Sequence, residues 1–204
     1  MNNKLKVAIT GGIGSGKTVF SKMIEEAGYN VIKADEVAKN ILVEDESVKN
    51  KIISFFGIDS YNDEGLNIEY LAEKVFIDSG NVKKINSIVH PVTIKKMMSL
   101  LDAENEKTGV AFCESALIFE ANREDMFDYV IVVSADEETR IKRVMERDNI
   151  SEEEILRRMD NQISEEEKKR NSDFTIINNG TLEELKQKSE FIINLLKTLS
   201  FKGD

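Results

Sequence analysis

The sequence of 204 residues contains one cysteine, one proline and one histidine. A single cysteine, Cys113, excludes an internal disulfide and a metal site built from several thiolates, and it fits a reducing compartment. Nowhere do roughly 18 apolar residues follow one another, and the first residues lack the apolar core of a signal peptide. We therefore expect a soluble, cytoplasmic protein.

Basic residues are also in deficit. The 28 lysines and arginines are outnumbered by 38 aspartates and glutamates, which gives a formal net charge of −10. Nucleic acids and anionic membranes are polyanions, so this charge argues against broad binding to either. Hydrophobic residues make up 41% of the chain, which is enough for a buried core. We expect no nucleic acid, no membrane and no obligate protein partner.

Short apolar segments alternate with helical patterns along the chain. We predict five strands, within "KLKVAIT", "YNVIKAD", "GVAFCESALIF", "DYVIVVSA" and "DFTIINN". Strands separated by helices imply right-handed crossovers and therefore a parallel sheet covered on both faces. The predicted fold class is α/β.

Two segments interrupt this alternation. About seventy residues between the second and third strands exceed an ordinary connection and predict a helical lobe. Within it, Pro91 stands where a helix would begin. A highly charged segment between the fourth and fifth strands predicts either a solvated surface hairpin or a mobile lid. We expect one domain, with its core at about 1–36, 108–147 and 172–204, the lobe at about 37–107 and the lid at about 148–171.

The last part of the chain predicts a packing helix. It opens with Thr181 and Glu184 in the spacing of a capping box. An apolar stripe then follows, formed by Leu182, Leu185, Ile192, Leu196 and Leu199.

The clearest motif is GGIGSGKT, which satisfies G-x-x-x-x-G-K-[ST] between a predicted strand and a predicted helix. Its glycines let several N–H groups converge on phosphate oxygens, and the following helix directs its positive end at the same anion. Lys17 can reach the β- and γ-phosphates, and the Thr18 hydroxyl can ligate Mg²⁺. We predict a nucleoside triphosphate site formed by Gly11, Gly12, Ile13, Gly14, Ser15, Gly16, Lys17, Thr18 and Val19.

Two carboxylates come at the ends of predicted strands. Asp35 ends the second strand, at the sheet edge where ligands bind in such folds. It could take a proton from an attacking hydroxyl, and an acid at this position could equally cap the following helix. Glu114, late in the third strand, could hold a magnesium-bound water or simply be a polar strand end. Both alternatives stay open.

Three arginines share a helical face. Arg140, Arg143 and Arg147 follow the spacing i, i+3, i+7. Planar, permanently charged guanidinium groups suit the negative charge that spreads over a phosphoryl group in transfer. Arg140 has Asp136 four residues earlier, so we interpret it as half of a surface ion pair. For Arg143 and Arg147, which have no such acid, we favour a functional role.

Two classes of protein use such a loop, namely nucleotide switches and kinases. A guanine-specific switch would normally have D-x-x-G and N-K-x-D after the loop, and neither motif occurs. A kinase is therefore favoured. The alternatives are a small-molecule kinase with a different hydroxyl acceptor and an ATP-dependent switch.

Eight stretches occur in a characteristic order: TGGIGSGKT, GYNVIKAD, FFG, HP, LIFE, R-x-x-x-R-D from Arg143 to Asp148, Gln162 and SDFTIINNG. In this order they resemble the dephospho-coenzyme A kinase family over nearly the whole chain. The resemblance implies a P-loop kinase fold with a substrate-binding lobe and a lid. It also implies transfer of the ATP γ-phosphoryl group, with Mg²⁺, to the ribose 3′-hydroxyl of dephospho-coenzyme A, the final step of coenzyme A synthesis.

The resemblance also implies roles for individual residues. Asp35 matches the family's catalytic carboxylate, and Arg143 matches an arginine that contacts the phosphates. For His90 we favour structure or substrate positioning over proton transfer. The residues implied at the acceptor are Asp35, Lys39, His90 and Glu114, and those implied at ATP include Arg147, Asn178, Asn179 and Gly180.

The chain departs from the family pattern at several positions. Lys33 replaces a second acid, and Lys39 replaces an arginine, which keeps the charge but loses the bidentate geometry. Ile68 replaces another arginine, and Ala116 replaces a common proline before LIFE. These changes leave the transfer chemistry intact and bear on contacts to the acceptor.

Overall fold

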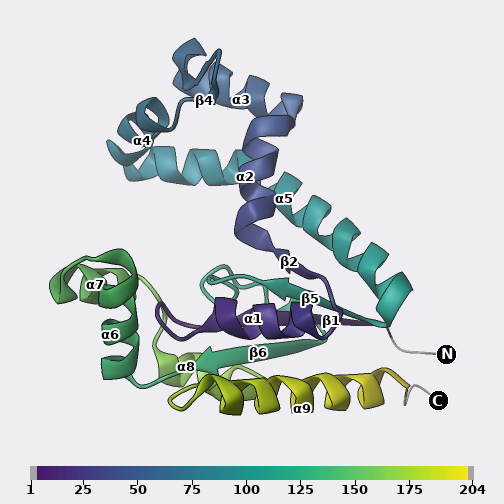
Figure 1. The fold of residues 1–204 in the computed structure, drawn as a ribbon. Coiled ribbons are helices and arrows are strands. Elements are labelled where there is room, and N and C mark those ends of the chain that lie inside the picture. The colour runs from purple at the N-terminus through teal and green to yellow at the C-terminus, as the bar shows by residue number, and fades with distance from the viewer. Residues whose placement is uncertain (1–3, 202–204) are drawn as a thin grey trace. The chain divides into compact units, whose positions relative to one another are not determined.

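The computed structural model describes residues 4–201, apart from the side chains of Phe76 and Ser79. The chain divides into two compact units (Figure 1). The helical unit comprises Lys33–Leu100, and the sheet unit comprises the residues before and after it. None of the helices formed by residues 4–201 has the length and apolarity that crossing a membrane requires.

The sheet unit is built on five strands in the order β2-β5-β1-β6-β7. Strand β1 pairs in parallel with β5 and β6, and β6 pairs in parallel with β7. The predicted five-stranded parallel sheet and the α/β class are confirmed. The strands are β1 (Leu5–Thr10), β2 (Val31–Lys33), β5 (Val110–Glu114), β6 (Tyr129–Ser134) and β7 (Phe174–Ile177).

Successive side chains of each strand point to opposite faces of the sheet, so the strands contribute to two separate hydrophobic cores. On one face, Val7 and Ile9 pack with α1 (Lys17–Glu26) and α9 (Leu182–Phe201), which run along the sheet in Figure 1. On the other face, Ala8 packs in a smaller cluster with Ile118, Phe119, Val130 and Val132. Cys113 is fully buried in β5. A sheet covered on both faces explains why its strands are continuous apolar runs.

The C-terminal helix begins as the sequence predicts. The Thr181 hydroxyl accepts a hydrogen bond from the Glu184 N–H at 3.2 Å. The expected apolar stripe is buried at Leu185, Ile192 and Leu196. Leu182, its first member, is 68% exposed, so the packed stripe starts one turn later than expected.

The charged segment forms two short helices, α7 (Glu152–Met159) and α8 (Glu165–Arg170), after α6 (Glu137–Asp148). The caps explain why so polar a segment is helical. The Ser151 and Ser164 hydroxyls accept from N–H groups in the first turns of α7 and α8. Each helix also has glutamates in its first turn and basic residues in its last turn. These charges interact favourably with the helix dipole and stabilise the helix.

The helical unit contains four helices, one 3₁₀ turn and a small antiparallel hairpin. Its core includes apolar side chains from each of the four helices, such as Ile41, Ile52, Leu71 and Val89. The elements are α2 (Ala34–Glu44), α3 (Glu46–Phe56), η1 (Ile58–Ser60), β3 (Tyr61–Asn62), β4 (Gly65–Leu66), α4 (Ile68–Phe76) and α5 (Ser79–Thr108), of which residues 101–108 belong to the sheet unit.

The expectation that a helix starts at Pro91 is wrong. Helix α5 contains Pro91 in its interior, and His90 likewise lies within the helix. An interior proline lacks an N–H donor and crowds the preceding turn, which costs about 3 kcal/mol. Burial on both sides offsets this cost, because Val89 before the proline and Thr93 and Met97 after it are buried.

Candidate active site

The phosphate-binding loop, Gly11–Gly16, joins β1 to α1. Gly14 has a φ of 77° and Gly16 a φ of 93°, a left-handed conformation that favours glycine. Gly16 is the N-cap of α1 and supplies no side-chain cap, so the first N–H groups of the helix face an anion site. The strand–loop–helix context that the motif requires is therefore present.

A cavity of about 590 Å³ lies against this loop. The loop residues line it together with the start of α1, including Thr18 and Val19. From elsewhere in the sheet unit it is lined by Ala116, Arg143, Val144, Arg147 and Gln162. The structure therefore brings the predicted triphosphate residues of the loop together with both favoured arginines.

Glu114, at the end of β5, contacts the two reactive residues of the motif. Its Oε1 accepts a hydrogen bond from Lys17 Nζ at 2.9 Å and another from Thr18 Oγ1 at 2.9 Å. Burial alone would raise the pKa of this carboxyl group. The charge of Lys17 and the hydrogen bonds from Lys17 and Thr18 outweigh burial and hold the pKa below its ordinary value. Glu114 is therefore an ionised acceptor at the loop.

The residues here fit a magnesium ion that arrives with a nucleotide. The Thr18 hydroxyl and the Glu114 carboxylate are oxygen donors of the kind that Mg²⁺ prefers. Within residues 4–201 there is no group of three or more His, Cys, Asp or Glu side chains that could hold a metal alone. Phosphate oxygens and waters would complete the ligand set, as is usual for Mg²⁺ at nucleotide sites.

Asn178 connects Arg143 to the loop. Its side-chain amide donates to the backbone carbonyl of Ser15 at 2.8 Å. The backbone carbonyl of Asn178 accepts a hydrogen bond from Arg143 Nη2 at 2.9 Å. Asn178 is only 6% exposed, and a Cβ atom on Gly16 would collide with its amide nitrogen. Asn178 therefore packs against the loop, and the predicted contact of Asn178, Asn179 and Gly180 with ATP stays a prediction.

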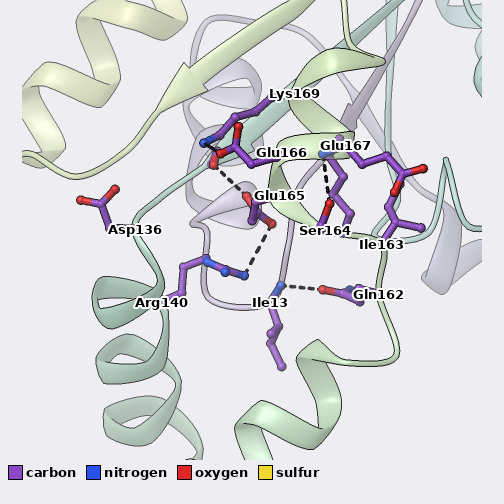
Figure 2. Close-up of polar contacts among 12 residues, drawn as sticks. Ile13, Asp136, Arg140, Gln162, Ile163, Ser164, Glu165, Glu166, Glu167 and Lys169 are labelled. Atoms are coloured by element: carbon purple, nitrogen blue, oxygen red, sulfur yellow. Dashed lines mark hydrogen bonds and ion pairs between the residues drawn. The ribbon is translucent and has the colours of Figure 1, made fainter.

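The interpretation of Arg140 as a surface residue paired with Asp136 is wrong. Arg140 is 6% exposed, and its Nη1 lies 3.5 Å from Glu165 Oε1 (Figure 2). Asp136 is the N-cap of α6 with a non-helical ψ of 146°, so the i, i+4 geometry of a helix does not apply to it. Its carboxylate instead accepts from the Asn179 amide at 2.7 Å.

Arg147 is exposed and forms a two-pronged ion pair with its neighbour. Its Nε and Nη2 lie 2.6 Å and 2.7 Å from the two carboxylate oxygens of Asp148. Arg147 also lines the cavity, so this ion-paired side chain lies near the phosphate loop.

The candidate acceptor residues of the helical unit lie on helix surfaces. Asp35 and Lys39 are exposed on α2, and His90 is exposed on α5. The N-cap of α2 is Lys33, so Asp35 does not occupy the capping position and that alternative is wrong. Ile68, which replaces a family arginine, is 71% exposed at the start of α4.

Two side chains at the loop were missed or left without a role. Gln162 was noted only through the family motif, and its Oε1 accepts from the Ile13 N–H at 3.0 Å. No role was predicted for Glu165, yet its carboxylate contacts Ser134 and Arg140. The sequence signals a helix start at Ser164, but nothing local distinguishes Glu165 from the two glutamates that follow it.

Comparisons with known proteins identify the family of the chain. The family model of dephospho-CoA kinase matches residues 5–184. A dephospho-CoA kinase of Salinibacter ruber is 39% identical over 185 residues, which is 90% of this chain and 93% of the relative. The solved dephospho-CoA kinase of Campylobacter jejuni has a TM-score of 0.74 at 28% identity, covering 95% of this chain and 97% of its own. The TT1252 structure from Thermus thermophilus has a TM-score of 0.82 at 29% identity, with 95% and 98% covered. The chain belongs to the dephospho-CoA kinase family.

Proposed function

We propose that the protein transfers the γ-phosphoryl group of ATP to the ribose 3′-hydroxyl of dephospho-CoA and releases CoA and ADP. One observation carries this proposal beyond the family match. Lys17 and Thr18 both contact Glu114 beside a cavity that Arg143 also lines, so cationic and oxygen-donor groups converge where the phosphates of ATP would lie. A different small-molecule acceptor is not favoured by the relatives.

ATP binding would rest on groups that are already in place. The N–H groups of the loop and of the first turn of α1 would donate to the β- and γ-phosphates. Lys17 has three ammonium protons, so it can hold Glu114 and a phosphate oxygen at the same time. Thr18 and Glu114 would hold Mg²⁺, which when bound neutralises charge on the β- and γ-phosphates.

The acceptor would be activated by Asp35. As the O–P bond forms, the carboxylate takes the proton of the ribose 3′-hydroxyl, and the bond from the γ-phosphorus to the bridging oxygen breaks to release ADP. Arg143 would neutralise the negative charge on the group in transfer. Lys39 and His90 would hold the acceptor, and closure of the charged segment would exclude water as a competing acceptor.

The deciding experiment measures ADP release by the purified protein with ATP and Mg²⁺, with and without dephospho-CoA. We expect ADP release that depends on the acceptor, together with a product heavier by one phosphate in mass spectrometry. ADP release that is equal with and without the acceptor, while other alcohols are phosphorylated, would assign the protein to a different acceptor. Slow hydrolysis that responds to no small molecule would favour a switch.

A further inference from the structure

The first half of the phosphate loop is in contact with the segment between α7 and α8. Gln162 Oε1 accepts from the Ile13 N–H at 3.0 Å. Three residues later, the Glu165 carboxylate lies against Gly12 so closely that a Cβ atom on Gly12 would collide with it. Figure 2 shows Gln162 pointing toward Ile13 and Glu165 pointing toward Arg140. Two neighbouring loop residues are therefore held by one short segment.

Glu165 is itself fixed by two partners. Its Oε2 accepts from the Ser134 hydroxyl at 2.7 Å, and its Oε1 lies 3.5 Å from Arg140 Nη1. The side chains of Arg140 and Glu165 are 8% and 14% exposed. A buried charge that loses its partner is strongly destabilising, so each member of this pair constrains the other.

Arg140 also lies close to two glycines of the loop. A Cβ atom on Gly12 would lie 2.8 Å from Arg140 Nη1, and a Cβ atom on Gly14 would lie 2.9 Å from the Arg140 Cα. Both distances are shorter than ordinary van der Waals contacts. Gly12 therefore packs against the Arg140 guanidinium group that Glu165 contacts, and Gly14 packs against the Arg140 backbone in α6.

The segment has its own attachment to the sheet unit, separate from the loop. Glu120 Oε1 accepts from the Ile163 N–H at 3.2 Å and lies 3.1 Å from Lys168 Nζ. Lys168 is fully buried, and α8 packs against β6. This anchor does not involve Gln162 or Glu165, so the segment keeps an attachment to the sheet unit when either side chain is changed.

We propose that Gln162 and Glu165 are positioning residues that hold residues 12–14 in the shape that binds nucleotide phosphates. Gln162 acts directly on the Ile13 N–H, and Glu165 acts through Arg140. The identity of the ligand rests on the proposed function. The positioning role is separate, since it concerns the shape of the loop whichever acceptor is used.

A charge effect and a positioning effect have opposite signs here. Glu165→Gln removes a negative charge close to a site for a polyanion, so electrostatics alone predicts tighter nucleotide binding. Loss of positioning predicts weaker binding. Glu166→Gln is a matched control, because Glu166 lies on the same helix, is 77% exposed at its side chain and pairs with Lys169.

The experiment measures Mg²⁺–ADP and Mg²⁺–ATP binding by calorimetry, together with KM and kcat for the full-length protein. We expect Gln162→Ala and Glu165→Gln each to weaken nucleotide binding and raise the ATP KM by about tenfold, the value of one good hydrogen bond. The acceptor KM should stay unchanged, and Glu166→Gln should behave as wild type. Circular dichroism and a melting curve set the assay temperature well below the Tm of each variant.

Glu165→Gln leaves a buried guanidinium group without its ion pair, so Arg140→Met is tested alone and combined with it. We expect the double variant to regain thermal stability relative to Glu165→Gln but not nucleotide affinity. Nucleotide binding in Gln162→Ala and Glu165→Gln that equals or exceeds that of wild type would overturn the positioning role. Failure of wild type to bind either nucleotide would instead overturn the proposed function.

Discussion

The two compact units present their candidate residues in different ways. In the sheet unit, site residues contact one another: Lys17 and Thr18 contact Glu114, Arg143 contacts Asn178, and Asn178 contacts the loop. In the helical unit, the candidates Asp35, Lys39 and His90 lie exposed on the surfaces of α2 and α5.

The two units therefore differ in how far their candidate residues are ordered before a substrate binds. Donors that are fixed before the substrate arrives need no reorganisation when charge develops, which is how such groups stabilise transition states. Exposed side chains such as those of Asp35 and Lys39 keep rotamer freedom until a ligand orders them, and that ordering reduces affinity. We therefore expect variants in the sheet unit to change ATP handling and variants in the helical unit to change acceptor chemistry.

The largest effect is expected for Asp35→Asn, which keeps the size of the side chain and removes the base. Loss of a positioned general base lowers turnover by about 10²–10⁴-fold. The ATP KM should change little, because Asp35 is expected to act on the acceptor and not on ATP. Rapid-quench measurement of CoA formation tests this. A variant with normal turnover and only a lower Tm would reduce Asp35 to an acid in the first turn of α2.

Lys17→Ala should affect the nucleotide side almost as strongly. Removing one preorganised donor to the transferred group costs about 10²–10³ in kcat. The Glu114 carboxylate would also lose its charged partner, so the melting temperature should fall. Single-turnover kinetics and a melting curve measure the two effects. Unchanged turnover would remove the loop lysine from the mechanism.

Arg143→Lys tests whether the geometry of the guanidinium group matters beyond its charge. The ammonium group cannot contact Asn178 and a phosphate oxygen in one planar arrangement. We expect transfer to slow by about tenfold, the equivalent of one hydrogen bond to a charged group, with the fold preserved. Transfer at the wild-type rate in a single turnover would contradict this role.

The smallest effect concerns Glu114 and pH. Its pKa in the folded protein is lowered from 4.5, so the ionised carboxylate stabilises the folded state above the pKa of the unfolded chain. This contribution is lost as the pH falls through the lower folded pKa. Glu114→Gln should lower the Tm at pH 7 by several degrees, at about 2–4 °C per kcal/mol. The Tm difference from wild type should shrink below pH 4.5, and a constant difference across this range would contradict the ionic role.

Local patterns predicted much of the sheet unit. The loop motif was found because its backbone angles require glycine at positions such as Gly14 and Gly16. The strands were found because burial on both faces leaves continuous apolar runs. The cap at Thr181 was found because its signal lies within four residues.

Contacts between distant residues could not be found in this way. Arg140 pairs with Glu165, and Gln162 contacts Ile13, and neither pair has a local signature. The nearer acid, Asp136, was preferred by spacing alone, although it lies outside the helical geometry of α6. Pro91 was placed at a helix start because its local cost is high, and packing on either side of it was invisible in the sequence.

The burial of Cys113 has a practical consequence. A thiol within β5 is out of reach of maleimide reagents while the protein is folded, and it is the sole cysteine of the chain. Fluorophores or spin labels can therefore be attached at chosen surface sites without first removing a native thiol. Lys51→Cys on α3 and Glu153→Cys on α7 are exposed positions in the two units. A doubly labelled protein would report the separation of the helical unit and the charged segment as each substrate binds.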